Sequence, residues 1–165
     1  MLKESIEKKL NEQVEKEGYS SQLYLAMASW AETLGFKGIS TWLFAQSDEE
    51  RKHMLKLVKY INERGGKATI PLLKEPPLIY DGIKPLFEQI LKHERFISES
   101  IHGIVELCNH EKDYTTLNWI QWFVQEQIEE ESQVKDILDK LNLMGDRDLL
   151  YIFDRDIMGM RQSSH

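Results

Sequence analysis

All four prolines of this 165-residue chain fall between Pro71 and Pro85. Gly65, Gly66 and Gly82 flank or enter the same window. Proline and glycine interrupt regular helices, so the stretch GGKATIPLLKEPPLIYDG predicts a long irregular connection. Because no proline occurs elsewhere, the segments on either side of this connection are free to form long helices.

Apolar residues recur at helical spacing on both sides of the connection. The pattern predicts four long helices, from about Ser5 to Leu34, Gly38 to Arg64, Gly82 to Asn109 and Tyr114 to Leu143. Three of them end next to a glycine, at Gly35, Gly65 and Gly145. A short fifth helix is predicted from about Asp146 to Met158.

The lengths of the connections determine how these helices pack. Each long helix would span roughly 40 Å at 1.5 Å per residue. Short connections after the first and third helices make each of those pairs antiparallel, whereas the proline-containing segment can travel the length of a bundle. We therefore predict an all-α fold. Residues 1–165 form one domain, a four-helix bundle with a long crossover between helices two and three and a short fifth C-terminal helix.

Composition excludes several classes of function. The formal net charge of -7 argues against nonspecific nucleic-acid binding, which needs clustered Lys and Arg. The single cysteine, Cys108, rules out an internal disulfide framework or a Cys-rich metal site, and it indicates a reducing cytoplasm. The N-terminal segment MLKESIEKKL lacks the apolar core of a signal peptide, and no apolar run is long enough to span a bilayer. We therefore expect a cytoplasmic protein without nucleic-acid or membrane partners.

Every long helix carries polar residues on its apolar face, near its middle. They are Gln13 and Glu17, then Gln46, Glu50 and His53, then Glu94, and finally Gln127 and Glu130. A buried carboxylate without a partner costs several kcal/mol and usually protonates instead. Lys and Arg are absent from these positions, so four coincident interruptions indicate a bound metal ion as the shared partner.

The spacing of these residues is specific. Glu50 and His53 form an E-x-x-H motif, which places both side chains on one helix face, and Gln127 and Glu130 form a matching Q-x-x-E. A symmetric di-iron bundle carries E-x-x-H twice. Here the second histidine is absent, which predicts two unequal metal positions with Glu50 as the bridging residue.

A second set of acids, Glu49, Glu126 and Glu129, stands one residue before the proposed ligands. One residue is about 100° around a helix, so these side chains flank the inner set. Spacing alone leaves two interpretations open: a third cation site, or a solvated acidic surface.

Four segments resemble the ferroxidase segments of bacterial non-haem ferritins, in the same order along nearly the whole chain. They are LNEQVEKEGYSSQLY, EERKHM, KHERFI and QWFVQEQIEEE. The resemblance implies a ferritin-like, di-iron protein of the cytoplasm that oxidises Fe(II) with O2 or H2O2. It also implies storage of ferric oxyhydroxide mineral inside a hollow homo-oligomeric shell of twenty-four subunits, built from dimers.

The resemblance also implies roles for individual residues. The first iron would bind Glu17, Glu50 and His53, and the second Glu50, Glu94 and Glu130, with Gln127 close by. A third iron would bind Glu49, Glu126, Glu129 and Glu130. Tyr24 matches the tyrosine beside the centre, either as an electron donor or as a hydrogen-bonded core residue.

Two positions depart from related patterns. Haem-containing bacterioferritins place a methionine directly after the helix-two glutamate; this chain has Arg51, so no haem is expected. Gly18 follows Glu17 in mid-helix, where glycine costs about 1 kcal/mol relative to alanine. Its purpose is open: it relieves crowding or loosens the helix.

Other functions remain as alternatives. A di-iron peroxidase or oxygenase could use the same bundle, although one cysteine cannot build the Cys-rich module that rubrerythrin-type enzymes usually add. A DNA-protecting mini-ferritin resembles this chain less, because its metal site is split across a dimer interface and it lacks the fifth helix. A purely structural bundle would leave the four polar interruptions unexplained.

Overall fold

The computed structural model describes residues 1–145 and 149–161. Their helices are α1 (Glu4–Thr33), α2 (Lys37–Glu63), α3 (Ile83–Glu111), α4 (Tyr114–Met144), α5 (Leu150–Asp156) and the 3-10 helix η2 (Ile157–Met160). The long helices begin and end close to the predicted residues. The predicted fifth helix starts at Asp146, which lies outside the described residues. Its described part is α-helical only as far as Asp156 and then tightens into η2.

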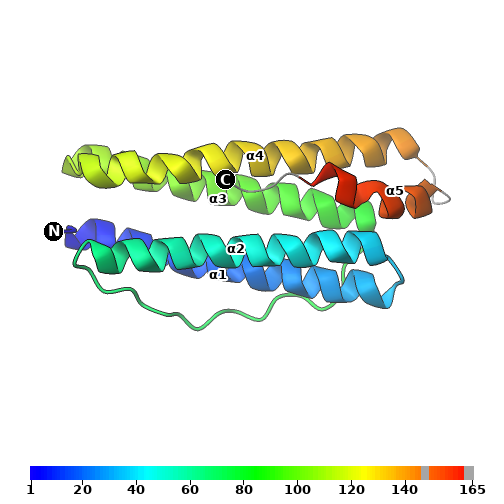
Figure 1. Cartoon of the computed structure of the whole chain (residues 1–165), viewed down its shortest axis with the longest axis horizontal. Helices are drawn as coiled ribbons and strands as arrows, with labels where there is room; N and C mark the ends of the chain where they lie inside the picture. Colours follow the sequence, from blue (N-terminus) through cyan, green and yellow to red (C-terminus); the bar gives the residue numbers. More distant parts are fainter. Residues whose placement is uncertain (146–148, 162–165) are drawn as a thin grey trace.

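Figure 1 shows the four long helices side by side, with the crossover running along the α1–α2 pair from one end of the bundle to the other. α1 is antiparallel to α2, and α3 is antiparallel to α4. The crossover delivers the chain to the end where α2 began, so α3 runs in the same direction as α2. This up-down-down-up order confirms the predicted bundle. No helix in the described ranges has the length and apolar character of a membrane span.

Glycines in the left-handed backbone conformation end three of the long helices, as the sequence predicts. Gly35, Gly65 and Gly145 have φ values of 87°, 81° and 60°, which favour glycine. α3 is different, because it runs past the predicted end at Asn109 and stops at Lys112, a non-glycine residue with φ 57°. Asp113 follows and accepts a hydrogen bond from the Thr116 backbone N–H at 2.9 Å, which caps α4.

The core is layered along the bundle axis. One apolar cluster, which includes Tyr24, Trp42 and Phe87, fills the end next to α5. A second cluster, which includes Leu10 and Phe123, fills the opposite end. On every long helix the buried carboxylates, and His53 on α2, fall between the positions that belong to these two clusters. The polar interruptions therefore form a single buried layer between two apolar ones.

Gly18 relieves crowding at the level of this polar layer. A Cβ at residue 18 would lie 3.0 Å from Met54 Sδ and 3.2 Å from a methyl group of Leu73. The crossover therefore packs directly on the α1 backbone here, with Leu73 turned inward. Of the two explanations that the sequence left open, this contact supports relief of crowding.

α5 docks on the first turn of α2. Asp154 Oδ1 accepts a hydrogen bond from the Ile39 backbone N–H at 2.8 Å, and so satisfies a donor that the helix start leaves free. A Cβ on Gly38 would lie only 1.7 Å from the backbone oxygen of Asp154. Phe153 and Ile157 are buried in the adjoining apolar cluster. Close backbone approach at Gly38 thus seats the C-terminal helices.

We predict that Gly38→Ala lowers thermal stability, because the new methyl group must push α5 away from α2. The expected loss is about 1–3 kcal/mol, typical of overpacking. Gly103→Ala is the matched control: this glycine is also helical, but its Cβ position meets only Lys9 Cε at 3.9 Å. That change should raise stability by about 0.5–1 kcal/mol through helix propensity. Equal melting temperatures for the two variants would contradict the docking argument.

Candidate metal centre

The buried polar layer draws one or more side chains from each long helix. Its ionisable members are Glu17, Glu50, His53, Glu94, Glu126 and Glu130, all of them buried. Helical spacing explains how they meet. Residues three or four apart project from the same face, so the two turns that carry Glu50 and His53 both point into the bundle.

Three sets of these side chains place their ligand atoms within 4.8 Å of one another: Glu17 with Glu50 and His53, Glu50 with Glu94 and Glu130, and His53 with Glu126 and Glu130. Glu50 belongs to the first two sets, and His53 Nδ1 lies 3.3 Å from Glu50 Oε2. The first set contains a nitrogen ligand, while the second contains only oxygen. The geometry therefore has the asymmetry that the missing second histidine predicts.

Amide side chains support the carboxylates. Gln13 donates to Glu17 Oε1 at 3.0 Å, and Gln46 donates to Glu130. Gln127 donates to Glu94 Oε2 at 3.0 Å, so its amide nitrogen is directed at a proposed ligand. Sequence reasoning placed Gln13 and Gln46 on the polar face but gave them no role. Their spacing could have indicated a supporting role, because each glutamine stands four residues before a proposed ligand on the same helix.

Several atoms of the layer lack a hydrogen-bond partner within the described structure. They are Glu17 Oε2, Glu50 Oε1 and both ring nitrogens of His53, although each of these nitrogens lies within 3.6 Å of a carboxylate oxygen. Desolvated oxygen and imidazole atoms without partners are costly, and a cation would satisfy all of them together. Carboxylate oxygens with one imidazole form a donor set that suits Fe(II), Mn(II) or Zn(II).

Burial of like charges also shifts the pKa values of the side chains in this layer. Burial, reinforced by neighbouring Glu50, raises the pKa of Glu17 well above its usual range, and burial with Glu94 does the same for Glu130. Burial also raises the pKa of Glu94, to about 6. For His53, burial lowers the pKa, but Glu50 and the other nearby carboxylates outweigh it and raise the net value. Burial and like charge therefore favour the protonated form of these carboxyl groups.

Comparison with known proteins identifies the family. The family profile described as "Ferritin-like domain" matches residues 7–144 of this chain. The chain belongs to the ferritin family. A probable bacterial non-heme ferritin-like protein of Haemophilus influenzae is 41% identical over 95% of this chain and 96% of its own length. A bacterial non-heme ferritin of Campylobacter jejuni is 38% identical over 99% and 98% of the two chains.

Solved structures agree with this assignment. A novel open pore ferritin from the hyperthermophilic archaeon Archaeoglobus fulgidus superimposes with a TM-score of 0.94 at 39% identity, over 98% of each chain. A humanized archaeal ferritin gives 0.95 at 36% identity over the full length of both chains. The resemblance seen in the four sequence segments is therefore confirmed, and it supports iron storage as the broad function.

The three acids that flank the proposed ligands differ in burial. We call them the outer carboxylates: Glu49, Glu126 and Glu129. Glu126 is buried, and its Oε2 lies 3.6 Å from His53 Nε2. Glu49 and Glu129 are only partly buried, and neither joins a set of three ligand atoms in the described chain. Glu126 therefore connects the inner layer to the outer one.

Tyr24 and His93 lie beside the ferritin's polar layer. The Tyr24 hydroxyl donates to Glu94, and burial followed by the Glu94 charge raises the pKa of Tyr24 well above its usual range. Ser20 Oγ donates to the Lys16 carbonyl at 3.0 Å, so it accepts from His93 Nε2–H at 2.7 Å. Burial lowers the pKa of His93 to about 4. The neutral His93 ring stands edge-on to the Tyr24 ring, 6.1 Å between centroids.

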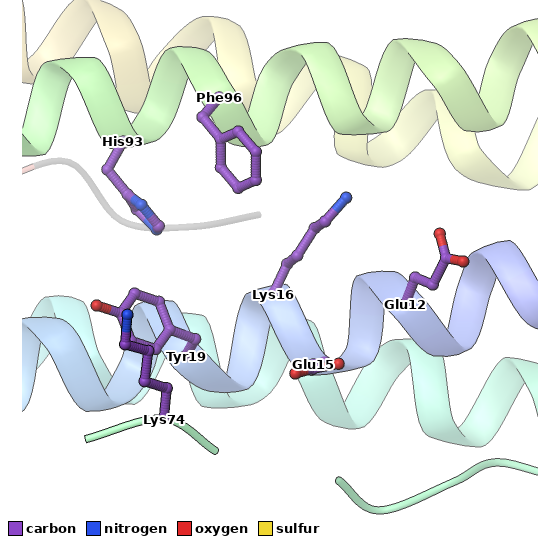
Figure 2. A pocket seen from close by; sticks show the side chains of 7 residues that line it. All are labelled: Glu12, Glu15, Lys16, Tyr19, Lys74, His93 and Phe96. Carbon is purple, nitrogen blue, oxygen red and sulfur yellow. The ribbon is translucent and has the colours of Figure 1, made fainter. Parts of the chain in front are cut away.

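His93 faces a surface pocket of about 480 Å³ rather than the metal ligands. Figure 2 shows its lining side chains, which come from α1, α3 and the crossover: Glu12, Glu15, Lys16, Tyr19, Lys74, His93 and Phe96. None of the proposed ligands lines this pocket. Of its lining residues, His93 also contacts the Tyr24 ring.

We predict that metal-free protein loses stability as pH rises from about 5 to about 8. The pKa values of Glu17, Glu94 and Glu130 are raised above the ordinary value for a glutamate, so the folded protein holds protons that the unfolded chain has released. His53 acts in the same direction, because its raised pKa favours the folded state only while the ring is protonated. Thermal unfolding of chelator-treated protein across this pH range measures the effect.

Zn²⁺ should remove most of that loss at neutral pH, since a cation replaces the protons. Saturation at about 100 times Kd adds roughly 2.7 kcal/mol per bound ion. A Glu50→Gln/His53→Gln chain is the control and should gain much less. A melting temperature that changes neither with pH nor with added Zn²⁺ would count against a cation site in this layer.

Proposed function

We propose that this ferritin is an iron-storing ferroxidase that oxidises Fe(II) with O2 or H2O2 and deposits ferric oxyhydroxide inside a hollow shell. The observation that supports it best is a pair of buried ligand sets that share Glu50. In this proposal the first Fe(II) binds Glu17, Glu50 and His53, and the second binds Glu50, Glu94 and Glu130. Gln127 supports Glu94 close to the pair, and the outer carboxylates with Glu130 receive a third ion.

The chemistry follows from the donor atoms. Carboxylates are hard ligands that stabilise Fe(III) relative to Fe(II), so they favour oxidation. Two Fe(II) ions held together supply two electrons to one oxidant molecule, which avoids release of a one-electron radical. The second set has only oxygen ligands and holds its ion less firmly than the set with His53. Release of ferric product begins at this weaker set, and the centre then takes up Fe(II) again.

Tyr24 is proposed as an auxiliary electron donor. Its hydroxyl donates to Glu94, a ligand of the second ion, so a proton and an electron can leave the ring along the same contact. A packing role is the competing explanation, because the ring also belongs to an apolar cluster. A Tyr24→Phe chain that binds metal normally and oxidises Fe(II) at the wild-type rate would leave the residue only that packing role.

The proposal includes a cytoplasmic homo-oligomer of twenty-four subunits built from dimers. Four apolar side chains of the crossover are exposed on the single chain: Ile70, Leu72, Leu78 and Ile79. Leu73 of the same segment packs near Gly18 instead. An exposed apolar row of this kind favours burial against a second copy. Twenty-four chains of 19.5 kDa give a native mass of about 470 kDa, and a monomeric or dimeric mass in solution would contradict the shell.

We predict that Glu50→Ala/His53→Ala abolishes the fast phase of Fe(II) oxidation, because each ligand set loses a member. Stopped-flow absorbance of ferric product, after anaerobic loading with about two Fe(II) per subunit and mixing with oxygen, measures this phase. The loss should be on the order of 100-fold or more, as for removal of a group that stabilises developing charge.

Glu99→Ala/His102→Ala provides the matched control. These residues form the same E-x-x-H spacing on α3, but both are exposed to solvent. Oxidation by this control should equal that of the wild type. If the Glu50/His53 variant also oxidised iron at full speed, the site assignment would be wrong.

A further inference from the structure

Glu49, the α2 member of the outer carboxylates, is paired with two cations. Lys52 Nζ and Arg161 Nη2 each lie 3.7 Å from the same Glu49 oxygen, Oε1. The two pairs differ in their exposure to water. The Lys52 side chain is 71% exposed, whereas the Arg161 side chain is 15% exposed and that of Glu49 is 13% exposed. The Arg161 pair is therefore the less screened of the two.

The fold brings Arg161 to this position from far along the chain. α5 is fastened to the start of α2 by Asp154, and Ile157 of η2 is buried in the apolar cluster at that end. η2 contacts both α2 and α4, the helices that carry the outer carboxylates. The Arg161 backbone N–H then donates to the Met158 carbonyl at 3.3 Å. The packing of α5 and η2 therefore places Arg161 beside Glu49.

A guanidinium at this place opposes a metal ion in two ways. It engages a carboxylate oxygen that the third ion needs as a ligand, and its positive charge repels that ion at short range. Lys56 adds to the effect at the other outer carboxylate. Its ammonium lies 3.6 Å from the centre of the Trp122 ring and is attracted by the charge of Glu126. Lysine and arginine side chains therefore already partly balance the charges of Glu49 and Glu126.

We propose that Arg161 competes with the third metal ion for the outer carboxylates. The inference rests on the proposed function, since it assumes that a third ion approaches the inner pair from this side. An ion reaching Glu49 must displace the guanidinium, so the outer position holds iron weakly and in transit. The two inner positions, whose ligand sets do not include Glu49, stay strong.

Anaerobic titration with Zn²⁺ tests this without any redox chemistry. Isothermal titration calorimetry on the assembled protein should resolve tight binding at the inner sets and a weaker step at the outer one. Arg161→Gln should tighten the weaker step on the order of tenfold, more than an exposed ion pair is worth. The tight steps should not change.

Two further variants separate charge from structure. Lys52→Gln removes a cation at the same 3.7 Å distance from the same oxygen, but an exposed one, and should tighten the weaker step by less than about twofold. Arg161→Lys keeps the charge and should restore wild-type weakness. An unchanged weaker step in Arg161→Gln overturns the proposal, and so does an equal effect of Lys52→Gln. Absence of the tight steps in every variant would refute the di-iron function instead, so the two failures are distinguishable.

Discussion

The structure depends on one unfavourable constraint: several carboxylates of like charge share a buried layer with a single histidine. In the described chain, Glu17, Glu50, Glu94 and Glu130 are each almost fully withdrawn from solvent. Such a layer is tolerated in two states, protonated or bound to cations. Apolar clusters lie on both sides of it and limit its contact with water, so its charges need protons or a cation as partners. The apolar clusters at the two ends of the bundle thus hold the charged layer in place between them.

A hydrogen-bond framework holds this layer in shape. A chain of side chains runs from Lys16 through Ser100 and Gln13 to Glu17, with donor–acceptor distances of 2.7, 2.6 and 3.0 Å. Gln13 thereby fixes Glu17 Oε1, while Glu17 Oε2 has no hydrogen-bond partner in the described structure. Preorganised oxygens cost less to arrange when a metal ion arrives, since their side chains have already lost rotational freedom.

Much of this was predictable because helical periodicity carries it. The four long helices and the polar layer follow from residue spacing that repeats over many turns, which leaves little ambiguity about which face is buried. Sequence reasoning could not weigh contacts that join distant segments. The approach of Leu73 to Gly18 and the pairing of Arg161 with Glu49 depend on how the crossover and the C-terminal helices dock. Helix ends without glycine were also harder, as the run of α3 to Lys112 shows.

The two ligand sets also differ in when they can form. Glu17, Glu50 and His53 all belong to α1 and α2, which are joined by a short turn. The first set therefore needs only a local helical hairpin. The second set combines Glu50 with residues of α3 and α4, so it exists only after the crossover has closed the bundle. Local contacts form early in folding and distant ones late. The first position can therefore assemble from the N-terminal hairpin alone, whereas the second requires three helices that the crossover brings together.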